Sequence, residues 1–181
     1  MTVSESLAKK ELLVSRVLHA PREDVWKAYT QPDQVKQWWG PRGFTAPVIE
    51  SELRPGGRYL YCMRAPNGKE FWSAGVFREF SPPERIVATD SFADREGNIV
   101  PASYYGLSDK WPLEDTMVIT FEEEGDGTRV TVREPGVPPG EDMDNAIAGW
   151  NESFDKLAEL VEAIGGGCRE RVHGGERREE D

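Results

Sequence analysis

The chain has few of the residues from which catalytic and metal centres are built. Its 181 residues include only two cysteines and two histidines. Cys62 and Cys168 lie far apart, so they predict neither a disulfide framework nor a metal motif. His173 falls in a charged C-terminal stretch, and His19 is expected to have an ordinary surface role. A Ser-His-Asp or Cys-His centre therefore has almost no support, and we expect no catalytic residues, metal or cofactor.

Long hydrophobic runs and an excess of positive charge are also missing. No apolar run approaches the roughly 18 residues of a membrane span. The residues given at the start of the sequence also do not have the apolar pattern of a secretory signal peptide. The net charge of −11 argues against nucleic acids and anionic membrane surfaces as partners. We therefore expect a cytoplasmic protein that binds neither nucleic acid nor membrane.

Aromatic residues, by contrast, are plentiful. The chain contains six tryptophans, seven phenylalanines and five tyrosines, and 38% of its residues are hydrophobic. This composition is sufficient for one packed domain. Because tryptophan is bulky and carries one N–H to satisfy, some of these rings are expected to line a cavity or an interface.

The hydrophobic pattern predicts one strand, two short helices and then a series of strands. The first strand covers 12–19, and the helices begin near Pro21 and at 34–39, with Asp33 as the cap of the second. Later strands are expected at 45–53, 58–65, 70–80, 85–92, 116–123 and 128–134. Short turns such as Asn67-Gly68 indicate an antiparallel meander.

One long amphipathic helix is predicted over 142–164. Its apolar stripe consists of Met143, Ile147, Trp150, Phe154, Leu157, Leu160, Val161 and Ile164. A helix of this length spans roughly 35 Å, enough to cross a domain, and Gly165–Gly167 are expected to end it. The fold class is therefore α+β. We expect a flexible N-terminus at 1–10, one domain at 11–164 and a disordered, charge-rich tail at 165–181.

The segment from Ala93 to Glu114 does not fit the strand pattern. It is long for a loop in a compact domain, and it contains Tyr104, Tyr105 and Trp111. Long loops of this kind are usually functional or disordered, and the aromatic residues favour packing. We interpret the segment as a flap over the mouth of a cavity.

The order of elements and several short motifs carry a family resemblance over about 12–162. The motifs are Ala20-Pro21 with Val25-Trp26, Trp38-Trp39-Gly40-Pro41 with Gly43-Phe44, Gly56-Gly57, Gly75, Pro82-Pro83-Glu84-Arg85, Gly127-Thr128 and Gly149-Trp150. The chain resembles the START-like, birch-pollen-allergen-like superfamily, and within it the proteins similar to the C-terminal domain of the activator of heat-shock-protein-90 ATPase. The resemblance implies a helix-grip fold, in which a curved antiparallel sheet of about six to seven strands wraps a long C-terminal helix and commonly encloses an apolar cavity.

Strand alternation suggests which side chains face such a cavity. Tyr59, Tyr61 and Met63 share one face of their strand, and Trp72 and Phe77 both face inward only if a bulge lies near Gly75. The candidate cavity residues are Trp38, Trp39, Phe44, Tyr59, Tyr61, Met63, Trp72, Asp90, Tyr104, Tyr105, Trp111, Met117, Ile119, Trp150 and Phe154. A solid core is the alternative interpretation for many of them.

Asp90 is unusual because it interrupts an apolar strand in phase with Ile86, Ala88 and Phe92. A buried carboxyl group there would have a raised pKa and would need a partner. The alternative is a position at a strand edge near solvent.

Three hypotheses for function follow. The first is a binding protein for a small hydrophobic or amphipathic molecule held between sheet and helix. The second, which the resemblance implies, is a co-chaperone-like interaction module whose partner is a chaperone or a second copy of the chain. The third is a cyclase or hydrolase that uses the cavity, with Asp90, Tyr104, Tyr105 and Asp109 as candidate groups. The pattern of residues does not specify the ligand.

Overall fold

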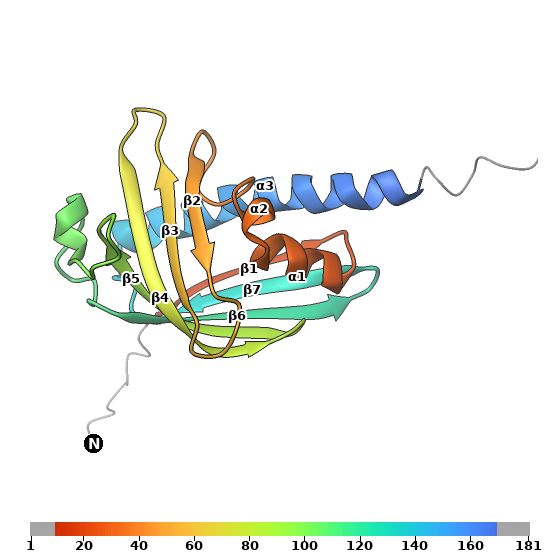
Figure 1. The fold of residues 1–181 in the computed structure, drawn as a ribbon, viewed down its shortest axis with the longest axis horizontal. Coiled ribbons are helices and arrows are strands. Elements are labelled where there is room, and N and C mark those ends of the chain that lie inside the picture. The colour runs from red at the N-terminus through yellow and green to blue at the C-terminus, as the bar shows by residue number, and fades with distance from the viewer. Residues whose placement is uncertain (1–9, 170–181) are drawn as a thin grey trace, which may run out of the picture.

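Seven antiparallel strands form one curved sheet in the computed structural model, which describes residues 10–169 (Figure 1). The order in the sheet is β1-β7-β6-β5-β4-β3-β2, so the strands after β1 form a continuous meander and β1 pairs with the last of them. The strands are β1 (Leu12–Leu18), β2 (Thr45–Ser51), β3 (Arg58–Arg64), β4 (Glu70–Ser81), β5 (Arg85–Ala93), β6 (Asp115–Glu124) and β7 (Gly127–Glu134). The predicted helix-grip meander is confirmed.

Two short helices, α1 (Arg22–Thr30) and α2 (Pro32–Val35), connect β1 to β2. Pro21 precedes α1, and two acidic residues occupy its first turn, where the helix dipole favours negative charge. The second helix is shorter than predicted and begins earlier. It starts at Pro32, whose fixed φ angle suits the first helical position, and gives way to turns before Trp38.

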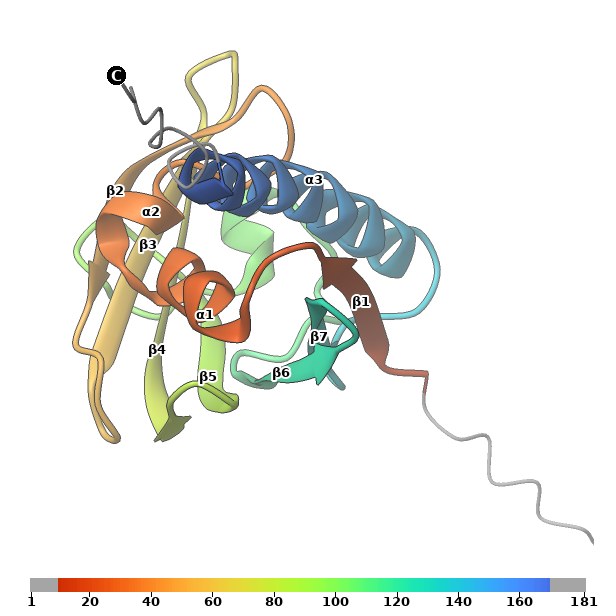
Figure 2. The ribbon, with the colours of Figure 1, turned by 90° about the vertical axis from the view of Figure 1, so that its right-hand side faces the viewer.

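The sheet wraps around α1, and the long helix α3 (Glu141–Arg169) crosses its open side (Figure 2). Register shifts interrupt two ladders, one between Thr45 and Val48 in β2 and one between Phe77 and Glu79 in β4. Such bulges bend a strand and increase its twist. The curvature gives the sheet a concave face, on which α3 packs against β1 and α1.

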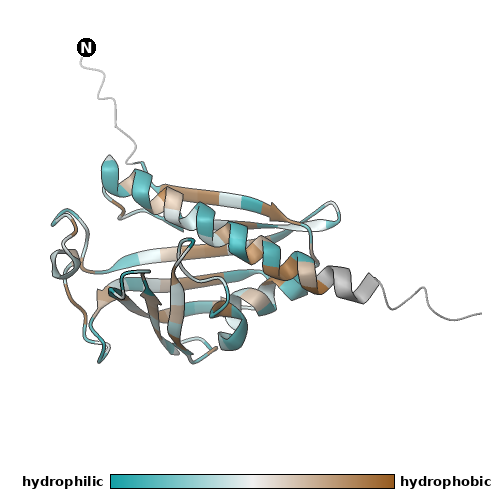
Figure 3. Ribbon diagram, turned by 90° about the horizontal axis from the view of Figure 1, so that it is seen from above, coloured by the Kyte–Doolittle hydropathy of each residue, from teal (hydrophilic) through white to brown (hydrophobic). Residues whose placement is uncertain are grey.

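The main core fills this concave face. From α3 it receives four buried side chains, which are Met143, Phe154, Leu157 and Val161. Ile147, Trp150 and Leu160 are only partly buried against them. The predicted stripe is thus confirmed along most of the helix but is wrong at Ile164, which is 43% exposed. Figure 3 shows brown, apolar bands becoming more frequent toward the C-terminal end of the visible face of α3.

The end of α3 also differs from the prediction. The helix continues through Gly165–Gly167 to Arg169 instead of stopping at the glycines. Glycine lowers helix stability by about 1 kcal/mol relative to alanine, but it does not forbid helical dihedral angles. The expected tail therefore begins inside the helix, and its remaining part, 170–181, lies outside the described residues, as do residues 1–9 of the expected flexible N-terminus. No helix within 10–169 is long and apolar enough to cross a membrane.

A smaller hydrophobic cluster lies on the opposite face of the sheet. It consists of Cys62, Trp72, Ala74 and Ala93, with Val48 and Leu60 packed against it. Strand alternation explains the split, because Tyr59 and Tyr61 enter the main core while their neighbours in β3 face the other way. Trp72 and Phe77 likewise lie on opposite faces, since the bulge of β4 follows Phe77 rather than falling at Gly75.

Replacing Phe154 with alanine is expected to lower the free energy of unfolding by about 3–5 kcal/mol, because a fully buried ring is lost and a cavity is left. Trp150→Ala should cost less, since Trp150 is only partly buried. Urea unfolding of the two variants, followed by far-UV circular dichroism, measures both losses. A loss at Trp150 as large as that at Phe154 would contradict this ranking.

Candidate functional site

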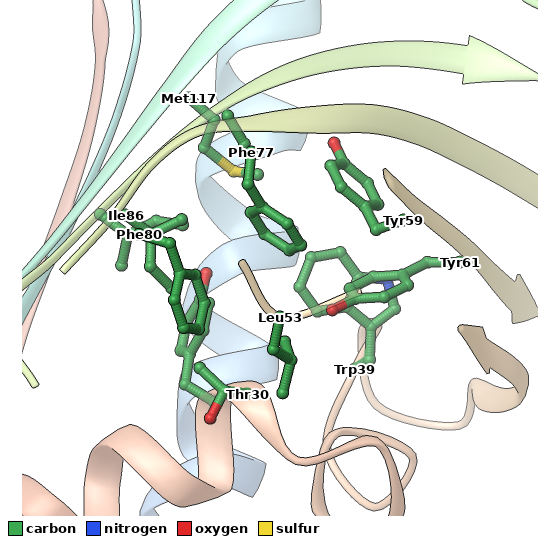
Figure 4. A pocket seen from close by; sticks show the side chains of 12 residues that line it. Thr30, Trp39, Leu53, Tyr59, Tyr61, Phe77, Phe80, Ile86 and Met117 are labelled. Atoms are coloured by element: carbon green, nitrogen blue, oxygen red, sulfur yellow. The ribbon is translucent and has the colours of Figure 1, made fainter. Parts of the chain in front are cut away.

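The main cavity lies on the concave face, between the sheet, α1 and the turn that carries Trp39 (Figure 4). Its enclosed volume is about 30 Å³, roughly the space that one water molecule takes up, and a wider hollow that includes open solvent surrounds it. Its walls are almost entirely apolar and are formed by Tyr29, Thr30, Trp39, Leu53, Tyr59, Tyr61, Phe77, Phe80, Ile86, Ala88, Met117 and Ile119. Concave apolar spaces with few polar groups are the usual sites for small molecules.

Aromatic rings that brace one another form one wall of the main cavity. The ring of Trp39 meets Tyr61 nearly edge-on, with 5.0 Å between centroids, and meets Trp150 at 5.6 Å. Tyr59 packs between Tyr61 at 5.1 Å and Phe77 at 5.6 Å. Edge-on and tilted contacts of this kind stabilise defined ring orientations, so these rings support one another along the wall.

Four residues of this wall carry a hydroxyl group, namely Tyr29, Thr30, Tyr59 and Tyr61. Thr30 donates to the carbonyl oxygen of Trp26 at 2.7 Å. The hydroxyl of Tyr59 lies 2.8 Å from both the Thr89 carbonyl oxygen and Asp90 Oδ1. Tyr29 is different, because its buried hydroxyl has no hydrogen-bond partner among the described residues.

A second, acidic pocket lies beyond Tyr59. It is lined by Ser73, Asp90, Ser91, Phe92, Trp111, Pro112, Asp115 and Glu134. Asp115 accepts hydrogen bonds from the backbone N–H groups of Gly136 and Thr116, each at 2.8 Å. Within residues 10–169, no ion pair compensates the three carboxyl groups, and no group of three or more His, Cys, Asp or Glu side chains could hold a metal ion.

Burial controls the charge of the acidic pocket. It raises the pKa of Asp90 above its ordinary value, although the hydrogen bond from Tyr59 opposes the shift. It raises the pKa of Glu134 much further, and the neighbouring charges of Asp90 and Asp115 act in the same direction. The carboxyl group of Glu134 therefore retains its proton more readily and donates it in a hydrogen bond to Asp90.

Tyr59 separates the two pockets, and Gly75 makes its position possible. A Cβ atom at Gly75 would lie 2.6 Å from Cε1 of Tyr59 and 1.9 Å from the carbonyl oxygen of Thr89. Neither the ring nor the backbone of β5 has room for that atom. The glycine thus lets the tyrosine ring lie directly against β4, with its hydroxyl group at Asp90.

The structure brings seven of the candidate residues to these two pockets. Trp39, Tyr59, Tyr61, Met117 and Ile119 line the main cavity. Asp90 and Trp111 line the acidic pocket instead. Asp90 is partly buried, and its raised pKa and its tyrosine partner agree with an inward position rather than with a solvent-exposed strand edge.

Three candidates from helices and turns pack beside the main cavity without lining it. Trp38 is fully buried, and its indole N–H donates to the Ala28 carbonyl oxygen at 2.8 Å. Phe154 is fully buried in the core, and Trp150 supports Trp39 from behind. None of the three lines the main cavity; Trp38, from the turn after α2, and Trp150 and Phe154, from α3, pack behind its wall instead.

Three candidates near the β3–β4 hairpin also lie elsewhere. Trp72 belongs to the cluster on the opposite face of the sheet. Phe44 and Met63 pack around Gly40, where a Cβ atom would approach Cβ of Phe44 to 3.2 Å and Cβ of Met63 to 3.4 Å. Met63 has the inward parity that was predicted, but the strand carries it past the end of the cavity.

The expected flap docks on the sheet rather than over the main cavity. Tyr104 is 61% exposed, whereas Tyr105, in the short 3₁₀ helix Ala102–Tyr105, is buried. The Tyr105 hydroxyl accepts from the Trp72 N–H at 3.0 Å and donates to the Ala93 carbonyl oxygen, so it joins β4 to β5. Neither tyrosine lines a pocket, and only Trp111 and Pro112 of this segment reach one, the acidic pocket.

Several lining residues were missed by sequence reasoning. Phe77 and Phe80 both reach the main cavity because the bulge after Phe77 changes the alternation of β4, and no residue pattern marks that bulge. Glu134 could have been found, because it continues the inward alternation of Val130 and Val132. The remaining missed residues are Tyr29, Thr30, Leu53, Ile86 and Ala88 in the main cavity and Ser73, Ser91, Phe92, Pro112 and Asp115 in the acidic pocket.

The raised pKa of Glu134 predicts a specific pH dependence of stability. Between its ordinary pKa of 4.5 and its higher pKa in the folded state, the folded protein binds more protons than the unfolded chain. The contribution of Glu134 to stability is therefore fully present below 4.5 and is lost as the pH rises through the folded-state pKa. Glu134→Gln should remove this loss, so the variant should gain stability over wild type as the pH rises.

Urea unfolding of wild type and Glu134→Gln at about pH 5 and about pH 8 tests this linkage. Glu162→Gln, at an exposed position on α3, is the control for the loss of one carboxyl group. Equal pH dependence in wild type and Glu134→Gln would contradict a protonated Glu134.

Comparison with known proteins agrees with this architecture. A crystal structure of protein CV1439 from Chromobacterium violaceum is similar, with 30% sequence identity and a TM-score of 0.70 over 84% of this chain and 96% of that one. Protein NE0264 from Nitrosomonas europaea is 26% identical, with a TM-score of 0.71 over 88% of this chain and 98% of that one. The AHSA1 protein SPO3351 from Silicibacter pomeroyi is 19% identical, with a TM-score of 0.66 over 86% of this chain and 99% of that one. At this identity the likeness shows the shared fold alone.

No curated protein matches the chain significantly. A family model does match it, over residues 19–162, and that family is described as Activator of Hsp90 ATPase homolog 1-like protein. This match extends over well more than half of the chain and contains both short helices, β2 to β7 and most of α3. The chain therefore belongs to the family of Activator of Hsp90 ATPase homolog 1-like proteins.

Proposed function

We propose that the protein binds a small apolar or amphipathic molecule in the main cavity. The observation that carries this proposal is empty apolar space inside a braced aromatic wall. Protein interiors are normally close-packed, and an unfilled apolar space forfeits contacts that a ligand can supply. The family relationship supports the same reading, because the helix grip leaves its concavity between sheet and helix. The cytoplasmic location expected from composition stays a prediction.

Filling the main cavity from its own wall should abolish binding. Ala88 lines the cavity and is 1% exposed, so Ala88→Leu places three further carbon atoms in a narrow space. We expect wild type to bind the neutral fluorescent probe N-phenyl-1-naphthylamine with roughly micromolar affinity, and Ala88→Leu to bind it at least about tenfold more weakly. Fluorescence titration measures both affinities.

Val87→Leu is the matched control, because Val87 neighbours Ala88 in β5 but faces away from the cavity. It should bind the probe as wild type does. Thermal melts of both variants distinguish a filled cavity from a disrupted fold. Equal binding by wild type and a folded Ala88→Leu would place the probe outside the main cavity and contradict the proposal.

A protein-interaction role is the second candidate. Several large apolar side chains are exposed on or near the loop that follows β5, namely Ile99, Tyr104, Leu107 and Leu113. Such a group, on a segment anchored to the sheet by Tyr105, suits contact with a chaperone or with a second copy of the chain. Charged substitutions at Tyr104 and Leu113 would weaken such a complex and leave binding in the main cavity unchanged, which gel filtration and probe titration measure separately.

A further inference from the structure

We infer that the ligand of the main cavity is electrically neutral and accepts a hydrogen bond from the hydroxyl group of Tyr29. This inference rests on the proposed function and specifies its ligand class. It starts from the hydroxyl oxygen of Tyr29, a residue of the cavity wall, because this atom is fully buried and has no hydrogen-bond partner among the described residues.

The position of Tyr29 is fixed by its neighbours. Its ring lies near the end of α1 and packs against Trp38 at 5.0 Å and edge-on against Phe121 at 5.4 Å. Both neighbours are fully buried, and Tyr29 itself is 6% exposed. The ring therefore cannot turn its hydroxyl group out to water without disturbing the core.

The free hydroxyl group at the cavity is unusual for a buried polar atom. Buried hydroxyl groups normally find a partner, because an unmade hydrogen bond leaves their desolvation uncompensated. Two other tyrosine hydroxyl groups of this fold do use a protein acceptor, that of Tyr59 with Asp90 and that of Tyr105 with Ala93. Tyr29 therefore has a donor available for a molecule in the cavity.

The chemical state of this donor is also defined. Burial raises the pKa of Tyr29 well above its usual range, and its acidic neighbours Tyr61, Glu134 and Asp90 raise it further when they are ionised. The phenol thus keeps its proton at neutral pH. A neutral phenol is a better donor than acceptor, so the matching ligand group is a carbonyl or ether oxygen.

The charges around the main cavity exclude an anionic ligand head. None of its lining residues is a lysine, arginine or histidine, and the nearby ionisable groups that act on Tyr29 are acidic. A carboxylate buried here would have no cation to compensate its desolvation. A neutral ketone, ester or ether is therefore favoured over a fatty-acid anion.

Three probes of similar shape test the inference. Acetophenone carries the carbonyl acceptor, α-methylstyrene replaces that oxygen with a methylene group, and benzoate carries a negative charge. Each is titrated by calorimetry into wild type, Tyr29→Phe and Tyr61→Phe. The last variant removes a different hydroxyl group from the same cavity wall and is the matched control.

The affinity of acetophenone should fall about fivefold in Tyr29→Phe, the effect of one neutral hydrogen bond. The affinity of α-methylstyrene should not fall, and Tyr61→Phe should leave the ratio of the two affinities as in wild type. Benzoate should bind wild type more weakly than acetophenone. Without ligand, Tyr29→Phe should melt no lower than wild type, because its hydroxyl group makes no hydrogen bond with the protein.

Four results would overturn the inference: an unchanged acetophenone affinity in Tyr29→Phe, an equal loss for both uncharged probes, tighter binding of benzoate than of acetophenone, or a lower melting temperature of ligand-free Tyr29→Phe. One of these four results can occur while α-methylstyrene still binds wild type and does not bind Ala88→Leu. In that case the cavity binds ligands, and only the role assigned to Tyr29 fails. If no uncharged probe binds wild type, the proposed function fails and the inference fails with it.

Discussion

The curvature of the sheet is the constraint on which the other features depend. Bulges in β2 and β4 bend the strands around α1, and the resulting concave face is wider than α3 can cover. Buried residues of α3, such as Phe154 and Leu157, fill part of it, and Trp150 braces Trp39. The space that remains is lined by side chains held in place from behind. The main cavity is therefore a consequence of the architecture, and the residues around it determine what it can hold.

Tyr59 divides the concave face into two chemically different compartments. Its ring belongs to the apolar wall, while its hydroxyl group reaches Asp90 in the acidic pocket. Gly75 permits this arrangement by leaving room for the ring on β4. The proton held between Asp90 and Glu134 reduces the charge that the fold must bury. An apolar and an acidic pocket thus lie on either side of one aromatic ring.

The sequence was informative where periodicity is strict. Alternation in β3 placed Tyr59 and Tyr61 correctly, and the spacing of three and four in α3 identified Phe154 and Leu157 as core. It was uninformative where geometry departs from a regular period, as at the bulge that brings Phe77 and Phe80 to one wall. It also could not show that the Tyr105 hydroxyl would bridge β4 and β5, because that contact joins distant parts of the chain. Fold and family could be predicted from motifs, but the membership of the cavity wall required tertiary structure.

An unpaired donor in a mostly apolar chamber would have a large effect on ligand selectivity. Apolar walls discriminate weakly between molecules of similar shape, since each added or missing methylene changes binding by only about 1–3 kcal/mol. A buried hydroxyl group changes this, because a ligand without a matching acceptor leaves that group unpaired. The acidic residues beyond Tyr59 add a second filter by opposing negative charge. On the proposed function, shape, one hydrogen bond and the sign of the local field would together give a selective site, although its wall is made almost entirely of hydrocarbon.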